Sequence, residues 1–346
     1  MESERILGQN HILRHFENAI RMGKISHAYI INGEEGSGKM NLAIHFAKAL
    51  QCERNNSNKA INEDGERITV PGTACGQCKS CKQTDSKNQP DIKYITYEKS
   101  GIGVDEIREQ INDDIDIKPY SSPYKIYIVP ESEKMTVQAQ NALLKTIEEP
   151  PEYAIIILLT TNADTFLQTI LSRCVMLNIR PVKEDIIKNQ LTSQYGVGDY
   201  EARVAATFSN GNPGKAIKLA TSEEFKELKQ YVVGMFMSLE KGGMDIIGEA
   251  IKKTGIFKKQ IDEYFSLMRI WFRDILVYKA TKEEDQIIFQ DEYMTIEKMS
   301  QTYSFDDIND ILKAIDLAES RIKSNVNFDS TIEILLLSIK EKTSGK

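Results

Sequence analysis

Three short runs of apolar residues stand out in the first half of the chain, at His27 to Gly33, Lys125 to Val129 and Tyr153 to Thr160. Continuous apolar runs of this length are typical of strands that are buried on both faces, as in a parallel sheet covered by helices. Apolar residues at helical spacing occupy Met40 to Leu50 and Thr136 to Glu149, and two consecutive prolines end the second of these segments. The first half therefore predicts an α/β domain.

The pattern changes after Pro181, where the strand signals fade. Residues 182–221 predict a few short helices interrupted by a turn at Gly211 to Gly214, and the chain from Glu223 to its end has helical periodicity throughout. One apolar stripe with i, i+3, i+4 spacing predicts a helix in the core or at a subunit interface rather than a cofactor site. The stripe consists of Ile261, Tyr264, Phe265, Met268, Trp271, Phe272 and Ile275.

The length, net charge and apolar content of the chain limit the classes of protein to which it can belong. The chain has 346 residues, which favours two or three domains, and its net charge of −7 argues against coating nucleic acid by bulk positive charge. A local basic patch stays compatible with this charge. No stretch approaches the roughly 20 apolar residues that span a bilayer, and the charged N-terminus lacks the apolar segment of a signal peptide. We therefore expect a soluble, cytoplasmic protein.

A glycine-rich loop follows the first predicted strand and precedes a predicted helix, which is the context of a phosphate-binding loop. Its glycines would let backbone N–H groups surround phosphates, and its lysine would reach the β- and γ-phosphate oxygens. The candidate cofactor-binding residues are Gly33, Gly36, Gly38 and Lys39.

Two features that hold magnesium are missing from this candidate site. Met40 occupies the position after the lysine, where a Ser or Thr hydroxyl would bind Mg²⁺. A metal-holding Asp is expected at the end of the strand Lys125 to Val129, but Pro130 stands there and is followed by Glu131, which could still orient a water. We therefore expect no hydrolysis by this chain, while passive binding of ATP or ADP stays open.

Four of the five cysteines form a candidate metal site. Cys75, Cys78 and Cys81 are spaced at intervals of three, and Cys52 can complete a set of four sulfur ligands across the polar, non-periodic segment Glu53 to Thr73. Four thiolates with no open position predict a structural zinc site, and the alternatives are an iron–sulfur cluster or free thiols. The fifth cysteine, Cys174, is expected to be a small buried residue.

Taken in order, several motifs resemble those of the delta-prime subunits of bacterial DNA polymerase III clamp loaders, which are AAA+ proteins. The resemblance covers most of the first 220 residues and is weak in the last third, where Asn325 to Asn327 carries it. The motifs are Gly8-Gln9, His27 to Tyr29, the loop Gly33 to Lys39, the cysteine cluster, Val104 to Arg108, Asn141 to Pro151 and Leu171 to Cys174.

The resemblance implies an AAA+ domain with a zinc module over residues 1–181, a helical lid over 182–221 and a helical collar for oligomerisation over 222–346. It also implies that Arg173 points across a subunit interface at the γ-phosphate bound by a neighbour. The implied partners are clamp-loader ATPase subunits, a clamp-opening subunit and, within the complex, the sliding clamp and primed DNA. No membrane partner is implied.

Departures from the hydrolysing relative in the same complex support a subunit that is not an enzyme by itself, within the DNA polymerase III holoenzyme. That relative should carry Thr or Ser at Met40, Asp at Pro130 and an arginine near Gly214 and Lys215. The polar pair at 161–162 occupies the family's phosphate-sensing position. Two alternatives stay open: a clamp-loader ATPase with a degenerate magnesium site, and a zinc-stabilised scaffold that binds partners without touching a nucleotide site.

Overall fold

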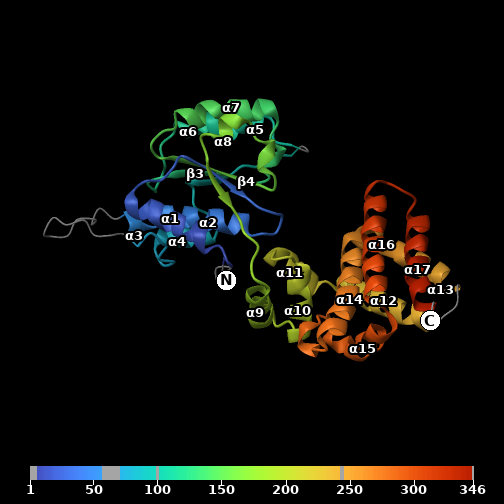
Figure 1. The fold of residues 1–346 in the computed structure, drawn as a ribbon. Helices are drawn as coiled ribbons and strands as arrows, with labels where there is room; N and C mark the ends of the chain where they lie inside the picture. The colour runs from blue at the N-terminus through green and yellow to red at the C-terminus, as the bar shows by residue number, and fades with distance from the viewer. Residues whose placement is uncertain (1–5, 57–70, 99–100, 242–244, 345–346) are drawn as a thin grey trace. The chain divides into compact units, whose positions relative to one another are not determined.

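The computed structural model describes residues 6–56, 71–98, 101–241 and 245–344 (Figure 1). Its contacts divide the chain into two compact units. The first unit extends to Ile187 and includes Gly211–Lys215, and the second comprises Lys188–Asn210 and Ala216–Lys346. Among the described residues, no helix combines the length and the apolar content needed to cross a membrane.

A five-stranded, fully parallel sheet forms the centre of the first unit, with the strand order β2-β3-β4-β1-β5. The three apolar runs form its three inner strands. The strands are β1 (Ala28–Asn32), β2 (Ile92–Tyr94), β3 (Lys125–Val129), β4 (Ala154–Thr160) and β5 (Val175–Asn178).

Helices cover both faces of this sheet (Figure 1). The helices of the first unit are α1 (Asn10–Met22), α2 (Lys39–Leu50), α3 (Glu53–Asn56), α4 (Lys79–Asp85), α5 (Val104–Ile107), a π-helical turn (Arg108–Asn112), α6 (Asp113–Ile115), α7 (Val137–Glu148) and α8 (Gln168–Leu171).

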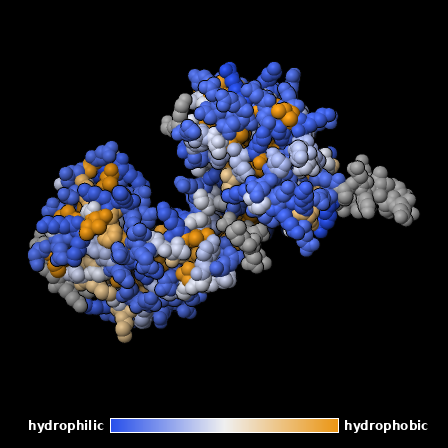
Figure 2. Space-filling model, turned by 180° about the vertical axis from the view of Figure 1, so that it is seen from behind, coloured by the Kyte–Doolittle hydropathy of each residue, from blue (hydrophilic) through white to orange (hydrophobic). Residues whose placement is uncertain are grey.

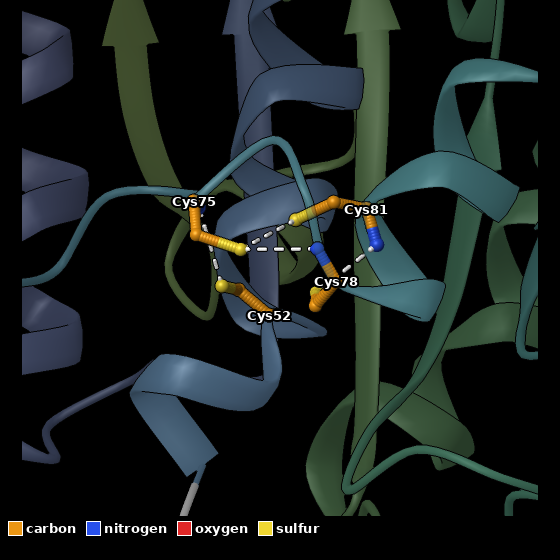
Figure 3. A group of neighbouring side chains, drawn as sticks. All are labelled: Cys52, Cys75, Cys78 and Cys81. Carbon is orange, nitrogen blue, oxygen red and sulfur yellow. Dashed lines mark hydrogen bonds between the residues drawn. The ribbon is translucent and has the colours of Figure 1, made fainter.

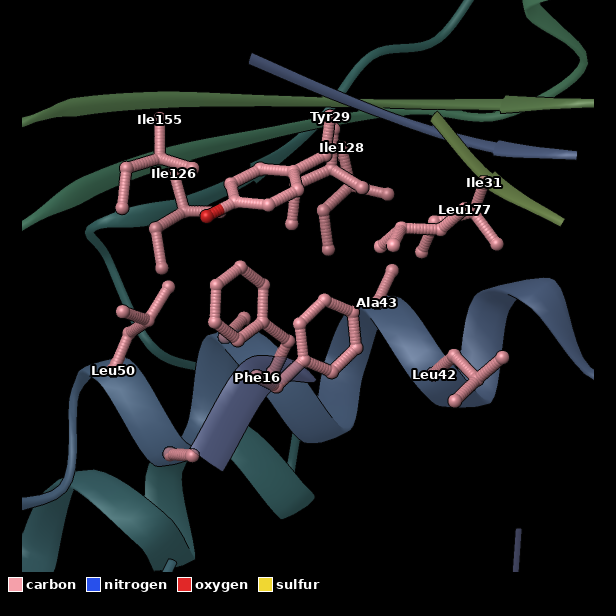
Figure 4. Close-up of a cluster of buried hydrophobic side chains, with 14 of the residues drawn as sticks. Phe16, Tyr29, Ile31, Leu42, Ala43, Leu50, Ile126, Ile128, Ile155 and Leu177 are labelled. Atoms are coloured by element: carbon pink, nitrogen blue, oxygen red, sulfur yellow. The ribbon is translucent and has the colours of Figure 1, made fainter. Parts of the chain in front are cut away.

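Alternate side chains of the inner strands enter two separate hydrophobic clusters, because successive residues of a strand point to opposite faces. Tyr29 and Ile31 of β1 pack with Phe16 of α1 and Phe46 of α2, and this cluster is drawn in Figure 4. Ile30 belongs to the opposite cluster, which contains apolar residues of α5, α7 and α8. The predicted parallel α/β fold class is confirmed.

The second unit is helical, as predicted. The helices that follow the sheet are α9 (Glu184–Tyr195), which begins in the first unit, α10 (Asp199–Phe208), α11 (Pro213–Thr221), α12 (Glu223–Lys241), α13 (Asp245–Ile256), α14 (Ile261–Thr281), α15 (Tyr293–Thr302), α16 (Phe305–Lys323) and α17 (Phe328–Ser344). The predicted stripe belongs to α14, where Trp271 and Phe272 are buried against Phe236 of α12. It is therefore a core stripe. The surface drawn in Figure 2 is largely hydrophilic, with hydrophobic residues in small separate patches.

Two expectations are only partly tested. The non-periodic segment Glu53 to Thr73 lies mostly outside the described residues, although its first four residues form α3. The three-part division at 181 and 221 stays a prediction, because the segment expected to form the lid contributes residues to both compact units.

Candidate functional site

The glycine-rich loop joins the end of β1 to the first residue of α2. Gly36 and Gly38 have φ angles of +78° and +94°, a region of backbone conformation that other residues rarely adopt. The loop therefore turns sharply and leads directly into the helix N-terminus at Lys39. Helix N-termini of this kind favour anions, because their first N–H groups have no partner within the helix.

Lys39 lies against its own loop. Its ammonium donates to the carbonyl oxygens of Gly33 (2.6 Å) and Glu34 (2.8 Å). Burial lowers the pKa of Lys39, and the nearby carboxylates of Glu133, Glu35 and Glu34 oppose that shift. Because an ammonium has three donors, one N–H is left for a phosphate oxygen. The cation is retained, but three carboxylates reduce the positive potential around it.

Met40, at the magnesium position, packs instead against the hydrophobic cluster beneath α2. A thioether is a soft ligand, whereas Mg²⁺ binds oxygen. The side chain therefore contributes packing here and no metal ligand.

The end of β3 also lacks a metal-holding carboxylate. Glu131, which follows Pro130, has a φ of +47°, and its carboxylate accepts hydrogen bonds from the Tyr97 hydroxyl and from the Lys134 ammonium (3.0 Å). The hydrogen bond from Tyr97 makes the largest contribution to lowering the pKa of Glu131, and the hydrogen bond from Lys134 makes the next largest. The Glu131 carboxylate, which could orient a water, is thus held by Tyr97 and Lys134.

The polar pair after β4 also has partners within the chain. Thr161 donates its hydroxyl to Glu133 (2.8 Å), and the Asn162 amide oxygen accepts from the backbone N–H of Asp164 (3.0 Å). Sequence reasoning identified Thr161 and Asn162 but did not identify Glu133 and Tyr97, because their partners lie 28 and 34 residues away.

A second unpredicted contact joins the loop to the turn at Gly211–Lys215. The buried Asn212 donates its amide to the carbonyl of Glu35 (2.7 Å), and the N–H of Gly214 donates to the carbonyl of Gly36 (3.1 Å). A Cβ on Gly214 would lie 2.5 Å from that carbonyl oxygen. Only glycine therefore permits this close approach of the two backbones.

Arg173 follows α8, and its side chain is 40% exposed. Its Nη1 donates to the Thr169 carbonyl (3.0 Å) and to the Ser172 hydroxyl (3.3 Å), and its Nη2 lies 3.0 Å from the Glu148 carboxylate at the end of α7. Exposed ion pairs of this kind contribute little, about 0–1 kcal/mol. The arginine is therefore paired within its own domain, but weakly.

The four predicted metal ligands converge. Their sulfur atoms all lie within 4.8 Å of one another, and they come from the second residue after α2, from the loop before α4 and from the start of α4 (Figure 3). Tetrahedral zinc with Zn–S bonds of about 2.3 Å requires sulfur atoms roughly 3.8 Å apart. The Cys75 and Cys81 sulfurs are 3.9 Å apart. The set could bind a metal ion such as zinc.

Backbone N–H groups favour the thiolate form of Cys75, which is the form that a metal needs. The Cys75 sulfur accepts from the N–H groups of Gln77 (3.5 Å) and Cys78 (3.3 Å), and these bonds lower the pKa of the Cys75 thiol to about 6. The Cys52 and Cys78 sulfurs likewise accept backbone N–H bonds from Cys75 and Cys81. Cys174 is separate from the cluster, and burial raises the pKa of its thiol to about 12.

A parallel sheet with this loop between its first strand and the next helix defines the class as a P-loop-type nucleotide-binding fold. The model of the family described as "DNA polymerase III, delta subunit" matches residues 8–183, and that of "DNA polymerase III, delta subunit, C terminal" matches residues 248–341. The chain therefore belongs to the DNA polymerase III delta subunit family.

Two relatives known by sequence agree with this assignment. The DNA polymerase III subunit delta' of Bacillus subtilis is 26% identical over 96% of each chain. The subunit tau of the same organism is 34% identical over 62% of this chain but only 36% of its own length. Among solved structures, a DNA polymerase III gamma subunit-related protein from Thermotoga maritima aligns over 96% of this chain and 99% of its own, with 20% identity and a TM-score of 0.40. The predicted resemblance to delta-prime subunits is confirmed.

Proposed function

We propose that this chain is a non-hydrolysing subunit of a replication clamp loader that supplies Arg173 to the ATP site of a neighbouring subunit. The observation that carries the proposal is the packing of Met40 against the hydrophobic cluster, at the position where an ATPase holds magnesium. A P-loop protein that has lost this ligand keeps its fold but not its own phosphoryl chemistry.

Two further features support the absence of hydrolysis. Pro130 replaces the metal-holding carboxylate, and Tyr97 and Lys134 hold Glu131 through hydrogen bonds. The carboxylates of Glu34 and Glu35 lie in the loop itself and would oppose a polyanionic triphosphate. Binding of ATP or ADP through Lys39 and the loop glycines stays a weaker proposal, supported by the retained backbone conformation.

The exposure of Arg173 is consistent with a role at the ATP site of a neighbouring subunit. A guanidinium is always charged and presents a planar fork of donors to a transferring phosphoryl group. Arginines that act in this way accelerate hydrolysis by about 10³- to 10⁵-fold in P-loop enzymes. Arg173 lies just after the short helix α8, and the contacts that hold it are accessible to solvent, so an approaching phosphate can compete for it.

Zinc, in this proposal, has a structural role. Cys52, Cys75, Cys78 and Cys81 would bind it as thiolates in a closed tetrahedral set, which supplies folding free energy and no catalytic water. Because Cys52 is the second residue after α2, the metal would fix the end of the helix that begins at the phosphate loop.

Membership of the family supports a proposal for the wider assembly. We propose that residues 1–181 form the AAA+ domain, residues 182–221 the lid and residues 222–346 the collar, and that the collar joins ATPase subunits and a clamp-opening subunit in the cytoplasm. The complex would load the sliding clamp on primed DNA. The similarity to the subunit tau of Bacillus subtilis is consistent with paralogous partners.

The test is the clamp- and DNA-stimulated ATPase of the reconstituted complex with wild-type chain or Arg173→Ala. We expect the share of turnover contributed by the neighbouring site to fall about tenfold or more, with assembly unchanged by gel filtration. Arg14→Ala, an exposed arginine on α1, is the matched control. An unchanged rate in an intact complex would favour the scaffold alternative, and magnesium-dependent turnover by the isolated chain would favour the ATPase alternative.

A further inference from the structure

The guanidinium of Arg173 lies where two helices end. It donates to the carbonyl of Thr169 in α8 and contacts the carboxylate of Glu148, the last residue of α7. Carbonyl groups in the last turn of a helix have no partner within the helix, so a cation placed there is stabilised. These contacts hold the arginine side chain against its own subunit.

Glu148 is unfavourably placed as an isolated residue. The C-terminal end of a helix carries a partial negative charge, so a carboxylate at the last position of α7 is repelled by its own helix. The Arg173 guanidinium, 3.0 Å away, offsets this repulsion. The ion pair therefore stabilises the Glu148 carboxylate at the C-terminal end of α7 and also holds the Arg173 side chain.

We infer that Glu148 is a positioning residue. It holds the Arg173 side chain against its own subunit and releases it when the ATP site of the neighbouring subunit is occupied. The inference rests on the proposed function of Arg173. Both side chains are near half exposure, at 45% and 40%, so the pair is weak and can exchange partners.

Arg173 must separate from Glu148 before it can bind a phosphate fully, because the phosphate and the carboxylate are both negatively charged. A phosphate group that approaches Arg173 while Glu148 stays in contact would meet a carboxylate of the same sign within a few ångströms. The described contacts of Arg173 involve its terminal nitrogens Nη1 and Nη2, and a guanidinium has five N–H donors in all, so a phosphate can engage a remaining donor before the pair with Glu148 separates. The carboxylate thus sets how much phosphate charge is needed to recruit the arginine.

The experiment measures ATPase against ATP concentration in the reconstituted, clamp- and DNA-stimulated complex. The variants are Glu148→Gln, Glu149→Gln and Arg173→Ala, together with the double variant Glu148→Gln/Arg173→Ala. Glu149 is the matched control, because it is the adjacent exposed carboxylate and forms no ion pair with any of the described residues. Gln has nearly the same shape as Glu and the position is exposed, so folding is preserved.

We expect Glu148→Gln to lower the ATP concentration for half-maximal turnover about twofold to fivefold, which is the range for losing one exposed ion pair. The shift should be largest at low salt and shrink above about 0.1 M, where exposed charges are screened. It should be absent from Glu149→Gln and from the double variant, because it acts through Arg173.

Three results would overturn the inference. A Glu148→Gln complex that matches Glu149→Gln at every salt concentration would leave Glu148 with no role in recruiting the arginine. A fall in maximal turnover without a shift in ATP concentration would mean that Glu148 holds Arg173 in its productive position. An Arg173→Ala complex with unchanged turnover would remove the proposed function itself, and is thereby distinguishable from the other two.

Discussion

Helix α2 connects two sites that differ in what they retain. At its N-terminal end the phosphate loop keeps the two left-handed glycines and Lys39, while Met40 packs into the hydrophobic cluster. At its C-terminal end, Cys52 and three further thiols come together in a geometry that fits a tetrahedral metal. One end preserves the backbone shape without the metal ligand, and the other preserves a full set of ligands.

The difference follows from what each site contributes to folding. A magnesium ligand affects only nucleotide chemistry, so a thioether that adds apolar packing can replace it without cost to the fold. A structural metal adds its binding free energy to folding, so the loss of one ligand lowers stability directly. The backbone of the loop persists because it joins β1 to α2 and contacts the turn at Gly211–Lys215.

The largest effect is expected at the cysteine end. Cys75→Ser removes one of four ligands and should reduce bound zinc to background, measured by elemental analysis of purified protein. We expect a loss of at least about 4 kcal/mol, part of the roughly 10–16 kcal/mol that zinc supplies to small zinc domains. A fall in Tm of about 10 °C would correspond to this loss.

Cys174→Ser is the matched control, since Cys174 is distant in sequence from the cluster and is not one of the four converging thiols. Its zinc content should equal that of wild type. Equal zinc content and equal Tm in Cys75→Ser and Cys174→Ser would show that the thiols do not hold a metal.

Local patterns predicted much of the fold. The three inner strands were predictable because a strand buried on both faces is continuously apolar, whereas β2 and β5 are short strands at the sheet edges and carry a weaker signal. The cysteine set was predictable because three of its four ligands lie within seven residues, at a spacing that a tight turn imposes.

The remainder of the site depends on contacts that no local pattern encodes. Asn212 reaches Glu35 across 177 residues. Glu148 lies at the end of a helix whose sequence gives no indication that an arginine just after α8 would pair with it. Such pairs depend on how the helices pack, which sequence periodicity does not specify.

An intermediate effect is expected at the phosphate loop from the change Gly214→Ala. The added Cβ would lie 2.5 Å from the carbonyl oxygen and 2.8 Å from the Cα of Gly36, so the two backbones must separate. We expect a cost of about 1–3 kcal/mol, typical of overpacking. Hydrogen exchange of residues 33–39, followed by mass spectrometry, should become faster because the loop loses the hydrogen bond to Gly214.

Gly234→Ala is the control for the added methyl group. Nothing lies within 4 Å of a Cβ at Gly234 in α12, so this change should leave loop exchange unaltered and stabilise the helix by up to about 1 kcal/mol. Unchanged loop exchange in Gly214→Ala would mean that the loop holds its shape without the turn.

The smallest effect is expected from Tyr97→Phe, which removes the hydroxyl that binds Glu131. The pKa of Glu131 in the folded chain is below its ordinary value. The hydrogen bond therefore stabilises the protein fully at pH values above the ordinary pKa, and this stabilisation is lost as the pH falls through the lowered pKa. Because the carboxylate is exposed to solvent, we expect the substitution to lower the free energy of unfolding by less than about 1 kcal/mol.

The stability difference between wild type and Tyr97→Phe, measured by urea unfolding, should be constant near neutral pH and shrink on acidification. Tyr120→Phe, at a tyrosine that is 89% exposed, should show no such dependence. A difference that grows as pH falls would place the stabilising charge elsewhere and leave Glu131 free to orient a water.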